Sequence, residues 1–134
     1  MKHLRKFNES SDEDMKSNIE DILSELSDRY IPVEVRNGIG SFPGSLCSIT
    51  LGDHIFGLER MISIVPSDNK DEFLRIYDYM ESEDYDFSSM SYDSDGDIVT
   101  LKVVDIGLGI DAFSNQLFNG IDETCYLKLF FRKK

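Results

Sequence analysis

The most regular alternation of apolar and polar residues lies between Tyr85 and Ile106, on both sides of Asp95-Gly96. An Asp-Gly pair between two alternating runs predicts a β-hairpin, because a type I′ turn needs positive φ at both central residues. Two strands alone are not stable in water, so the apolar face of this hairpin is expected to pack against the rest of the chain. That face carries Met90, Tyr92, Val99, Leu101 and Val103, with Tyr92 opposite Val99, Met90 opposite Leu101 and Ser88 opposite Val103.

Helical spacing of apolar residues predicts a long helix over Ser10–Tyr30. Ser10 and Glu13 have the spacing of a capping box, in which each side chain satisfies a backbone amide at the start of the helix. Pro32 favours an extended backbone at the residue before it and so ends the helix. The apolar stripe of this helix consists of Met15, Ile19, Ile22, Leu23 and Leu26.

Two further helices are predicted later in the chain. Pro66-Ser67 introduces the first, over Asp68–Glu81, and Gly120 closes the second, over Asp111–Asn119, as a C-cap. Apolar stripes at this spacing are typical of helices that pack on a core. The stripes are Phe73, Leu74, Tyr77 and Met80 in the first helix, and Ile110, Phe113, Leu117 and Phe118 in the second.

Alternation with a period of two predicts four more strands, which are Ile31–Arg36, Ser45–Leu51, Ile55–Val65 and Thr124–Arg132. The loop Asn37–Gly44 joins the first two. Its glycines have the spacing G-x-G-x-x-x-G and precede a strand, so they differ from the G-x-G-x-x-G pattern that binds a dinucleotide. Thr124–Arg132 has apolar side chains on both faces, which is typical of an interior strand.

Together these elements predict one α+β domain over residues 10–134, preceded by a separate segment at residues 1–9. Two main helices are expected to cover one face of a mainly antiparallel sheet of about six strands, in a two-layer sandwich. A helix followed by an antiparallel pair of strands occurs twice, which is the pattern of an α-β-β repeat.

Charge adds a strong constraint on partners. The formal net charge is −12, and residues 10–131 carry 25 acidic and 8 basic side chains. An excess of this size repels phosphate backbones, so we expect no direct nucleic-acid binding. Two roles are open for the carboxylates: they keep the protein soluble, or they bind a basic partner. Residues 81–97 hold seven acidic residues and no basic one, and they form a candidate interaction patch of Glu81, Glu83, Asp84, Asp86, Asp93, Asp95 and Asp97.

The cysteines and the apolar runs indicate a cytoplasmic protein. Cys47 and Cys125 are the only cysteines, and each lies in a predicted strand, as expected for free thiols in a reducing compartment. No apolar run approaches the roughly 20 residues that span a bilayer. The N-terminus lacks the apolar core of a signal peptide, so we expect no export by that route.

The first nine residues, MKHLRKFNE, are basic and differ from the acidic body. Met1, Lys2, Leu4, Phe7 and Glu9 match a leader found on many small proteins of large tailed bacteriophages, which this segment resembles. In some of these phages, similar leaders target internal head proteins into the prohead and are cut after a glutamate by the maturation protease. The resemblance implies a phage protein in the host bacterial cytoplasm or in the virion, with Leu4, Phe7 and Glu9 as leader or cleavage residues. The alternative is a short amphipathic segment that docks on the body, or a frayed tail.

Asp93, Asp95 and Asp97 surround Gly96 in a way that resembles a calcium-binding loop. With Gly96 at the sixth position of such a loop, Lys102 occupies the twelfth, where a bidentate glutamate belongs. The residues therefore favour a hairpin turn with solvated carboxylates. No metal and no other cofactor is expected.

Nucleophilic chemistry has one candidate set, which is Cys47 with His54 and Asp53. His54 is the only histidine outside the first nine residues, and it lies in a predicted turn without a serine or cysteine motif beside it. The sequence therefore predicts a protein that is not an enzyme. A cysteine-dependent hydrolase is kept as an alternative.

We expect a non-enzymatic bacteriophage protein, either virion-associated or an internal head protein, that acts through a protein partner. The alternative is an acidic decoy, or inhibitor, that occupies a basic groove on a host nucleic-acid-binding protein. The leader residues favour the first hypothesis, and the excess of carboxylates favours the second.

Overall fold

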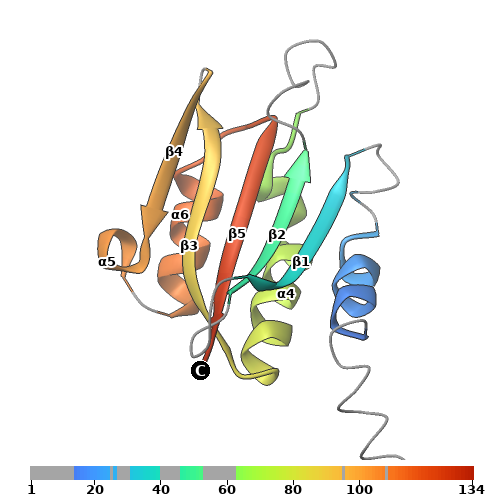
Figure 1. Cartoon of the computed structure of the whole chain (residues 1–134). Helices are drawn as coiled ribbons and strands as arrows, with labels where there is room; N and C mark the ends of the chain where they lie inside the picture. The colour runs from blue at the N-terminus through green and yellow to red at the C-terminus, as the bar shows by residue number, and fades with distance from the viewer. Residues whose placement is uncertain are drawn as a thin grey trace, which may run out of the picture.

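A five-stranded antiparallel sheet with the order β1-β2-β5-β3-β4 lies at the centre of the structure (Figure 1). The computed structural model describes residues 14–24, 26, 31–39, 46–52, 63–94, 96–107 and 109–134. Helices pack against one face of the sheet, which confirms the predicted α+β class. The strands are β1 (Val33–Ile39), β2 (Leu46–Gly52), β3 (Tyr85–Ser94), β4 (Asp97–Lys102) and β5 (Tyr126–Lys133).

β5 is the middle strand of the sheet although it follows all the others in the chain. It pairs antiparallel with β2 on one side and with β3 on the other, so it joins two hairpins that are far apart in the sequence. Leu127, Leu129 and Phe131 point to the helix-covered face and are at most 1% exposed. The prediction of an interior strand is confirmed, with its start at Tyr126.

The hairpin of β3 and β4 has the predicted register over most of its length. Two of the three predicted pairs form, which are Tyr92 with Val99 and Met90 with Leu101. Beside the turn, the backbone amide of Gly96 donates a hydrogen bond of 3.0 Å to Oδ1 of Asp93. Aliphatic and aromatic side chains on one face of this hairpin pack against the core, as expected.

The prediction that Ser88 lies opposite Val103 is wrong. β4 ends at Lys102, and Val103 begins the short helix α5 (Val103–Ile106). The backbone amide of Lys102 donates a hydrogen bond of 2.8 Å to Oδ2 of Asp105, which stabilises the first turn of α5 and turns the chain out of the sheet. A side chain that reaches back to the backbone in this way competes with strand pairing.

The first described helical segment covers residues 14–22, within the predicted helix Ser10–Tyr30. Its predicted stripe is confirmed, because Met15, Ile19, Leu23 and Leu26 are at most 5% exposed and Ile22 is half-buried against them. The predicted capping residues Ser10 and Glu13 lie outside the described residues.

The next helix, α4 (Lys70–Ser82), starts two residues later than predicted because a tight 3-10 turn, η1 (Pro66–Asn69), precedes it. Its buried face consists of Phe73, Ile76, Tyr77 and Met80. Leu74, predicted in this stripe, is only half-buried, and Ile76 takes its place. The buried face of the helix is therefore rotated slightly from the predicted stripe, although Phe73 and Tyr77 are buried as predicted.

The helix α6 (Ile110–Asn119) has nearly the predicted bounds, and Gly120 is its C-cap. Phe113 and Leu117 are buried, Phe118 is half-buried, and Ile110 is 36% exposed. Aromatic rings from four elements meet beneath this helix, at centroid distances of 4.9 Å for Tyr77 and Phe113, 5.0 Å for Phe87 and Phe113, and 5.7 Å for Phe87 and Phe131. Such tilted ring pairs add to the energy of apolar burial.

The described sheet has five strands instead of about six. Most of the predicted strand Ile55–Val65 lies outside the described residues, as does the segment at residues 1–9. In the described part of that strand, Ile64 forms an isolated bridge with Thr124. A helix followed by a hairpin occurs twice in the described order, before β1-β2 and before β3-β4.

β1 extends to Ile39 and includes the first residues of the predicted loop Asn37–Gly44. The pairing of β1 with β2 shifts between Arg36 and Ile39, as in a β-bulge, and Gly38 has φ of 78° there. Residues 40–44 of that loop lie outside the described residues, as does Ser45, the first residue of the next predicted strand.

Gly52→Ala is expected to destabilise the protein more than Gly38→Ala. Both glycines have positive φ, 79° and 78°, so alanine at either position carries the same backbone strain of about 1–2 kcal/mol. A Cβ at position 52 would also overlap the backbone carbonyl of Cys125, whereas a Cβ at position 38 would meet no atom within 4 Å. This overlap is expected to add about 1–3 kcal/mol to the loss. Urea unfolding of both variants measures the difference, and equal losses would contradict the close approach of Gly52 to the chain before β5.

Candidate functional site

The two faces of the sheet differ in their covering. Helices α4 and α6 lie behind one face in Figure 1, and the opposite face, called the open face below, is turned toward the viewer. Residues opposite each other on neighbouring strands point to the same face, so the register assigns each side chain to one face. The open face includes Glu34, Arg36, Leu46, Ser48, Thr50, Asp86, Ser89, Ser91, Asp93, Ile98, Thr100, Lys102, Tyr126, Lys128, Phe130 and Arg132.

Acidic and basic side chains are distributed unevenly between the strands and the rest of the described chain. The five strands carry four acidic and five basic side chains. The other described residues carry 14 acidic and four basic ones. We call the exposed carboxylates of the first helical segment, α4 and α6 the acidic helical layer, which consists of Asp14, Glu20, Asp21, Asp71, Asp78, Glu81 and Asp111.

The predicted interaction patch lies at the two ends of β3. Glu81, Glu83, Asp84 and Asp86 are found where α4 passes into β3, whereas Asp93 and Asp97 are beside the turn at the other end. Asp95 lies outside the described residues. Asp86 and Asp93 are roughly 23 Å apart at the usual rise of a strand. The six described carboxylates therefore form two groups, and among them only Glu81 belongs to the acidic helical layer.

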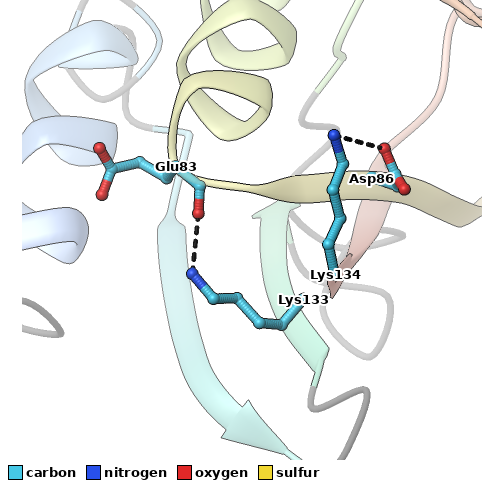
Figure 2. A network of polar contacts seen from close by, with 4 residues as sticks. All are labelled: Glu83, Asp86, Lys133 and Lys134. Atoms are coloured by element: carbon cyan, nitrogen blue, oxygen red, sulfur yellow. Dashed lines mark hydrogen bonds and ion pairs between the residues drawn. The ribbon is translucent and has the colours of Figure 1, made fainter.

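Basic residues at the C-terminal end of β5 contact the first of these groups (Figure 2). Lys133 Nζ donates a hydrogen bond of 3.0 Å to the carbonyl oxygen of Glu83, and Lys134 Nζ lies 3.5 Å from Oδ1 of Asp86. The backbone amide of Lys134 also donates to the carbonyl oxygen of Asp84, at 2.9 Å. The ion pair is largely exposed, so it is expected to contribute at most about 1 kcal/mol.

Aromatic and basic side chains alternate along the open face of β5. Tyr126, Lys128, Phe130 and Arg132 occupy successive positions on this face of the middle strand. Lys128 Nζ lies 5.1 Å from the centre of the Phe130 ring, within the range of a cation–π contact. The sequence shows this alternation, but only the register reveals that the four side chains share the uncovered face.

A shallow hollow of about 270 Å³ borders one end of this row. The bulged part of β3, the end of β4 and the start of α5 surround it, and Val104 at its rim is 89% exposed. Its volume is just below the roughly 300–1,000 Å³ of pockets for drug-sized ligands, so it suits a single small group. The lining residues are Asp86, Phe87, Ser88, Lys102, Val103, Val104 and Arg132.

The structure describes one member of the candidate nucleophilic set. Cys47 is fully buried on β2, and Cys125 is half-buried; both are free thiols. Burial raises the pKa of the Cys125 thiol, and the nearby Asp93 carboxylate raises this pKa further. His54 and Asp53 lie outside the described residues. A buried thiol and one with a raised pKa are both poor nucleophiles.

Within the described residues, no group of three or more histidine, cysteine, aspartate or glutamate side chains is placed to hold a metal ion. Asp93, one of the carboxylates compared with a calcium loop, accepts the Gly96 amide, as expected for a hairpin turn. The leader residues Leu4, Phe7 and Glu9 lie outside the described residues. No described helix is both long and apolar enough to cross a membrane.

Compared with protein-family models, with curated proteins and with solved structures, the chain matches none of them. The candidate sites therefore depend on the geometry of this chain alone.

Native-state alkylation is expected to leave Cys47 unmodified and to modify Cys125 slowly at pH 7. Cys47 is inaccessible, and the raised pKa of Cys125 keeps its thiol protonated at a pH where a free cysteine is partly ionised. The rate at Cys125 should rise as the pH increases, whereas both residues should react fully in urea. Mass spectrometry of iodoacetamide-treated protein measures each site. Rapid labelling of Cys47 in the folded protein would instead support the cysteine-dependent hydrolase.

Proposed function

We propose that this protein acts by binding rather than by catalysis, and that its acidic helical layer docks a basic protein. The observation that carries the proposal is the concentration of carboxylates outside the sheet, where 14 acidic residues stand against four basic ones in the described chain. A surface of one sign accelerates the approach of an oppositely charged partner and disfavours partners of the same sign.

α4 supplies a favourable docking element for such a partner. Asp71, Asp78 and Glu81 are exposed on it, while Phe73 and Tyr77 hold its opposite face in the core. The helix is therefore rigidly attached, so the carboxylates do not need to be ordered when the partner binds. A basic nucleic-acid-binding protein of the host has the complementary charge, which makes the chain a decoy for its groove.

Removing two carboxylates of α4 is expected to weaken capture of a basic partner. The variant Asp78→Asn with Glu81→Gln loses two charges from the acidic helical layer, and the control Asp93→Asn with Asp97→Asn loses two beside the turn of β3 and β4. A pull-down from bacterial lysate at about 50 and 500 mM salt compares both variants with the parent chain, since electrostatic capture is lost as salt rises. The proposal is supported if the parent chain and the control variant both capture a basic protein at low salt. That protein should be lost at high salt, and the α4 variant should fail to capture it. Equal release by both variants would contradict docking on the helical layer.

A second candidate function rests on the leader residues Leu4, Phe7 and Glu9. Their resemblance to phage head-targeting leaders supports a virion-associated protein that acts through a phage structural protein. The acidic body is compatible with either role, because both need a protein partner and neither needs a catalytic group.

Mass spectrometry of purified phage particles tests this second candidate. We expect peptides of the chain in the particle, either from the intact form or from a form that starts at Ser10 after removal of MKHLRKFNE. A Glu9→Gln variant should block the shortened form and leave packaging unchanged. Absence of both forms from particles that contain the other head proteins would contradict the virion role and leave the docking proposal unaffected.

A further inference from the structure

We propose that Asn37 is a site of spontaneous deamidation, at which the backbone nitrogen of Gly38 attacks the side-chain amide and converts asparagine to aspartate or isoaspartate. Glycine after asparagine favours this reaction, because it has no side chain to hinder the attack. The chain contains the sequence Asn-Gly-Ile twice, at Asn37 and at Asn119, so the local sequence favours both sites equally. The structure distinguishes them. This modification does not depend on the partner proposed for the acidic helical layer.

The nucleophile and the carbon that it attacks lie close together in the bulge of β1. Asn37 and Gly38 have no partner residues on β2, because the pairing shifts between Arg36 and Ile39. The backbone amide of Gly38 donates instead to Oδ1 of Asn37, at 2.9 Å. Cγ is one carbonyl bond, about 1.23 Å, from Oδ1, so the nitrogen is roughly 3.5 Å from Cγ. This separation is at the outer limit of the distances from which reacting atoms proceed to attack.

The hydroxyl of Tyr85 supplies a hydrogen-bond donor at the carbonyl oxygen of the same amide. Tyr85 is buried at the start of β3, and its hydroxyl donates a hydrogen bond of 3.1 Å to Oδ1 of Asn37. Negative charge develops on this oxygen when the nitrogen attacks, and a donor already in position stabilises that charge. Nδ2 donates to Sδ of Met15 at 3.6 Å, which orients the amide with its oxygen toward Tyr85.

The reaction passes through a succinimide ring and needs only water and hydroxide. The Gly38 nitrogen loses its proton to hydroxide and forms a bond to Cγ of Asn37. The bond from Cγ to Nδ2 then breaks, and Nδ2 takes a proton from water and leaves as ammonia. Water next opens the ring at one of its carbonyls. Opening at Cγ gives aspartate, and opening at the backbone carbonyl gives isoaspartate, in which the main chain runs through Cγ.

Asn119 has the same following residues but a different geometry. The Gly120 amide donates a hydrogen bond of 3.0 Å to the carbonyl oxygen of Gln116, at the end of α6. Nδ2 of Asn119 donates to Oδ1 of Asn115 at 2.9 Å, which directs the side chain back along the helix. A Cβ added at Gly38 would meet no atom within 4 Å, whereas one added at Gly120 would lie 2.5 and 2.6 Å from Gln116 atoms. Ring closure at Asn119 therefore requires the helix end to open first.

The product changes the attachment of β1 to its neighbours. A carboxylate at position 37 cannot donate to Sδ of Met15, so the contact with the first helical segment is lost. Isoaspartate also lengthens the main chain by one carbon in the bulge. Because residue 37 has no partner on β2, the pairing of residues 33–36 is expected to survive the change.

Incubation of the full chain at mildly alkaline pH, in water enriched in oxygen-18, tests the proposal. Hydrolysis of the succinimide incorporates the label, so peptide mass spectrometry measures only the reaction that occurs during the incubation. In guanidinium both sites should react at similar rates, because each is then an unfolded Asn-Gly-Ile segment. In the folded protein Asn37 should react about tenfold or more faster than Asn119, which has to open locally. Exposure alone predicts the opposite order, since Asn119 is exposed and Asn37 is half-buried.

A Tyr85→Phe variant tests the donor at Oδ1. It should slow the reaction at Asn37 by roughly tenfold and leave Asn119 unchanged, because only Asn37 loses a hydrogen bond to its carbonyl oxygen. Equal rates at the two sites in the folded parent chain, or a faster reaction at Asn119, would overturn the proposal. A folded Tyr85→Phe variant that reacts at Asn37 at least as fast as the parent chain would also overturn it. Thermal melting verifies that the variant is folded, and the comparison of the two sites in the parent chain does not depend on the variant.

Discussion

The backbone pairing of β5 with both β2 and β3 is the interaction on which the rest of the structure depends. Each flanking hairpin alone would be a two-stranded ribbon, which is marginal in water. β5 converts the two hairpins into one sheet with a continuous apolar face. Just before β5, the hydroxyl of Thr124 donates a hydrogen bond of 2.8 Å to the carbonyl of Asp93 and accepts one of 3.1 Å from the backbone amide of Asp93. These two bonds hold the end of β3 against the start of β5.

The two faces of β5 also differ in the side chains that they carry. Its buried side chains anchor the helices, and the outer sides of those helices carry seven exposed carboxylates, whereas the five strands together carry four acidic residues. Its other face carries the alternating rings and cations. The net charge of −12 does not show this difference, because it sums the charges of the helices and of the open face.

Local patterns account for the elements of this fold, and tertiary contacts account for what the patterns miss. Turn chemistry at Gly96 sets the β3–β4 register, and apolar residues on both faces of the last strand identify it as interior. The position of β5 between the hairpins has no local signal, so the strand order could not be predicted. The contact of Lys133 and Lys134 with the acidic residues at the start of β3 is likewise long-range. For the same reason the sequence indicated one acidic patch where the structure has two groups. It predicted that helices cover one face of the sheet, but not which charged side chains of different strands lie together on the other face.

The late position of β5 in the chain has a consequence for how the protein folds. Both helix–hairpin units precede it, and they touch only through it within the described sheet. During synthesis the two units therefore leave the ribosome with unpaired strand edges, which invite association between nascent chains. Closure of the sheet has to bring together segments more than 70 residues apart, such as β2 and β5, and such non-local contacts make folding slow. Acidic residues on the early helices would reduce the association of these incomplete chains through mutual repulsion. This effect does not require a binding partner.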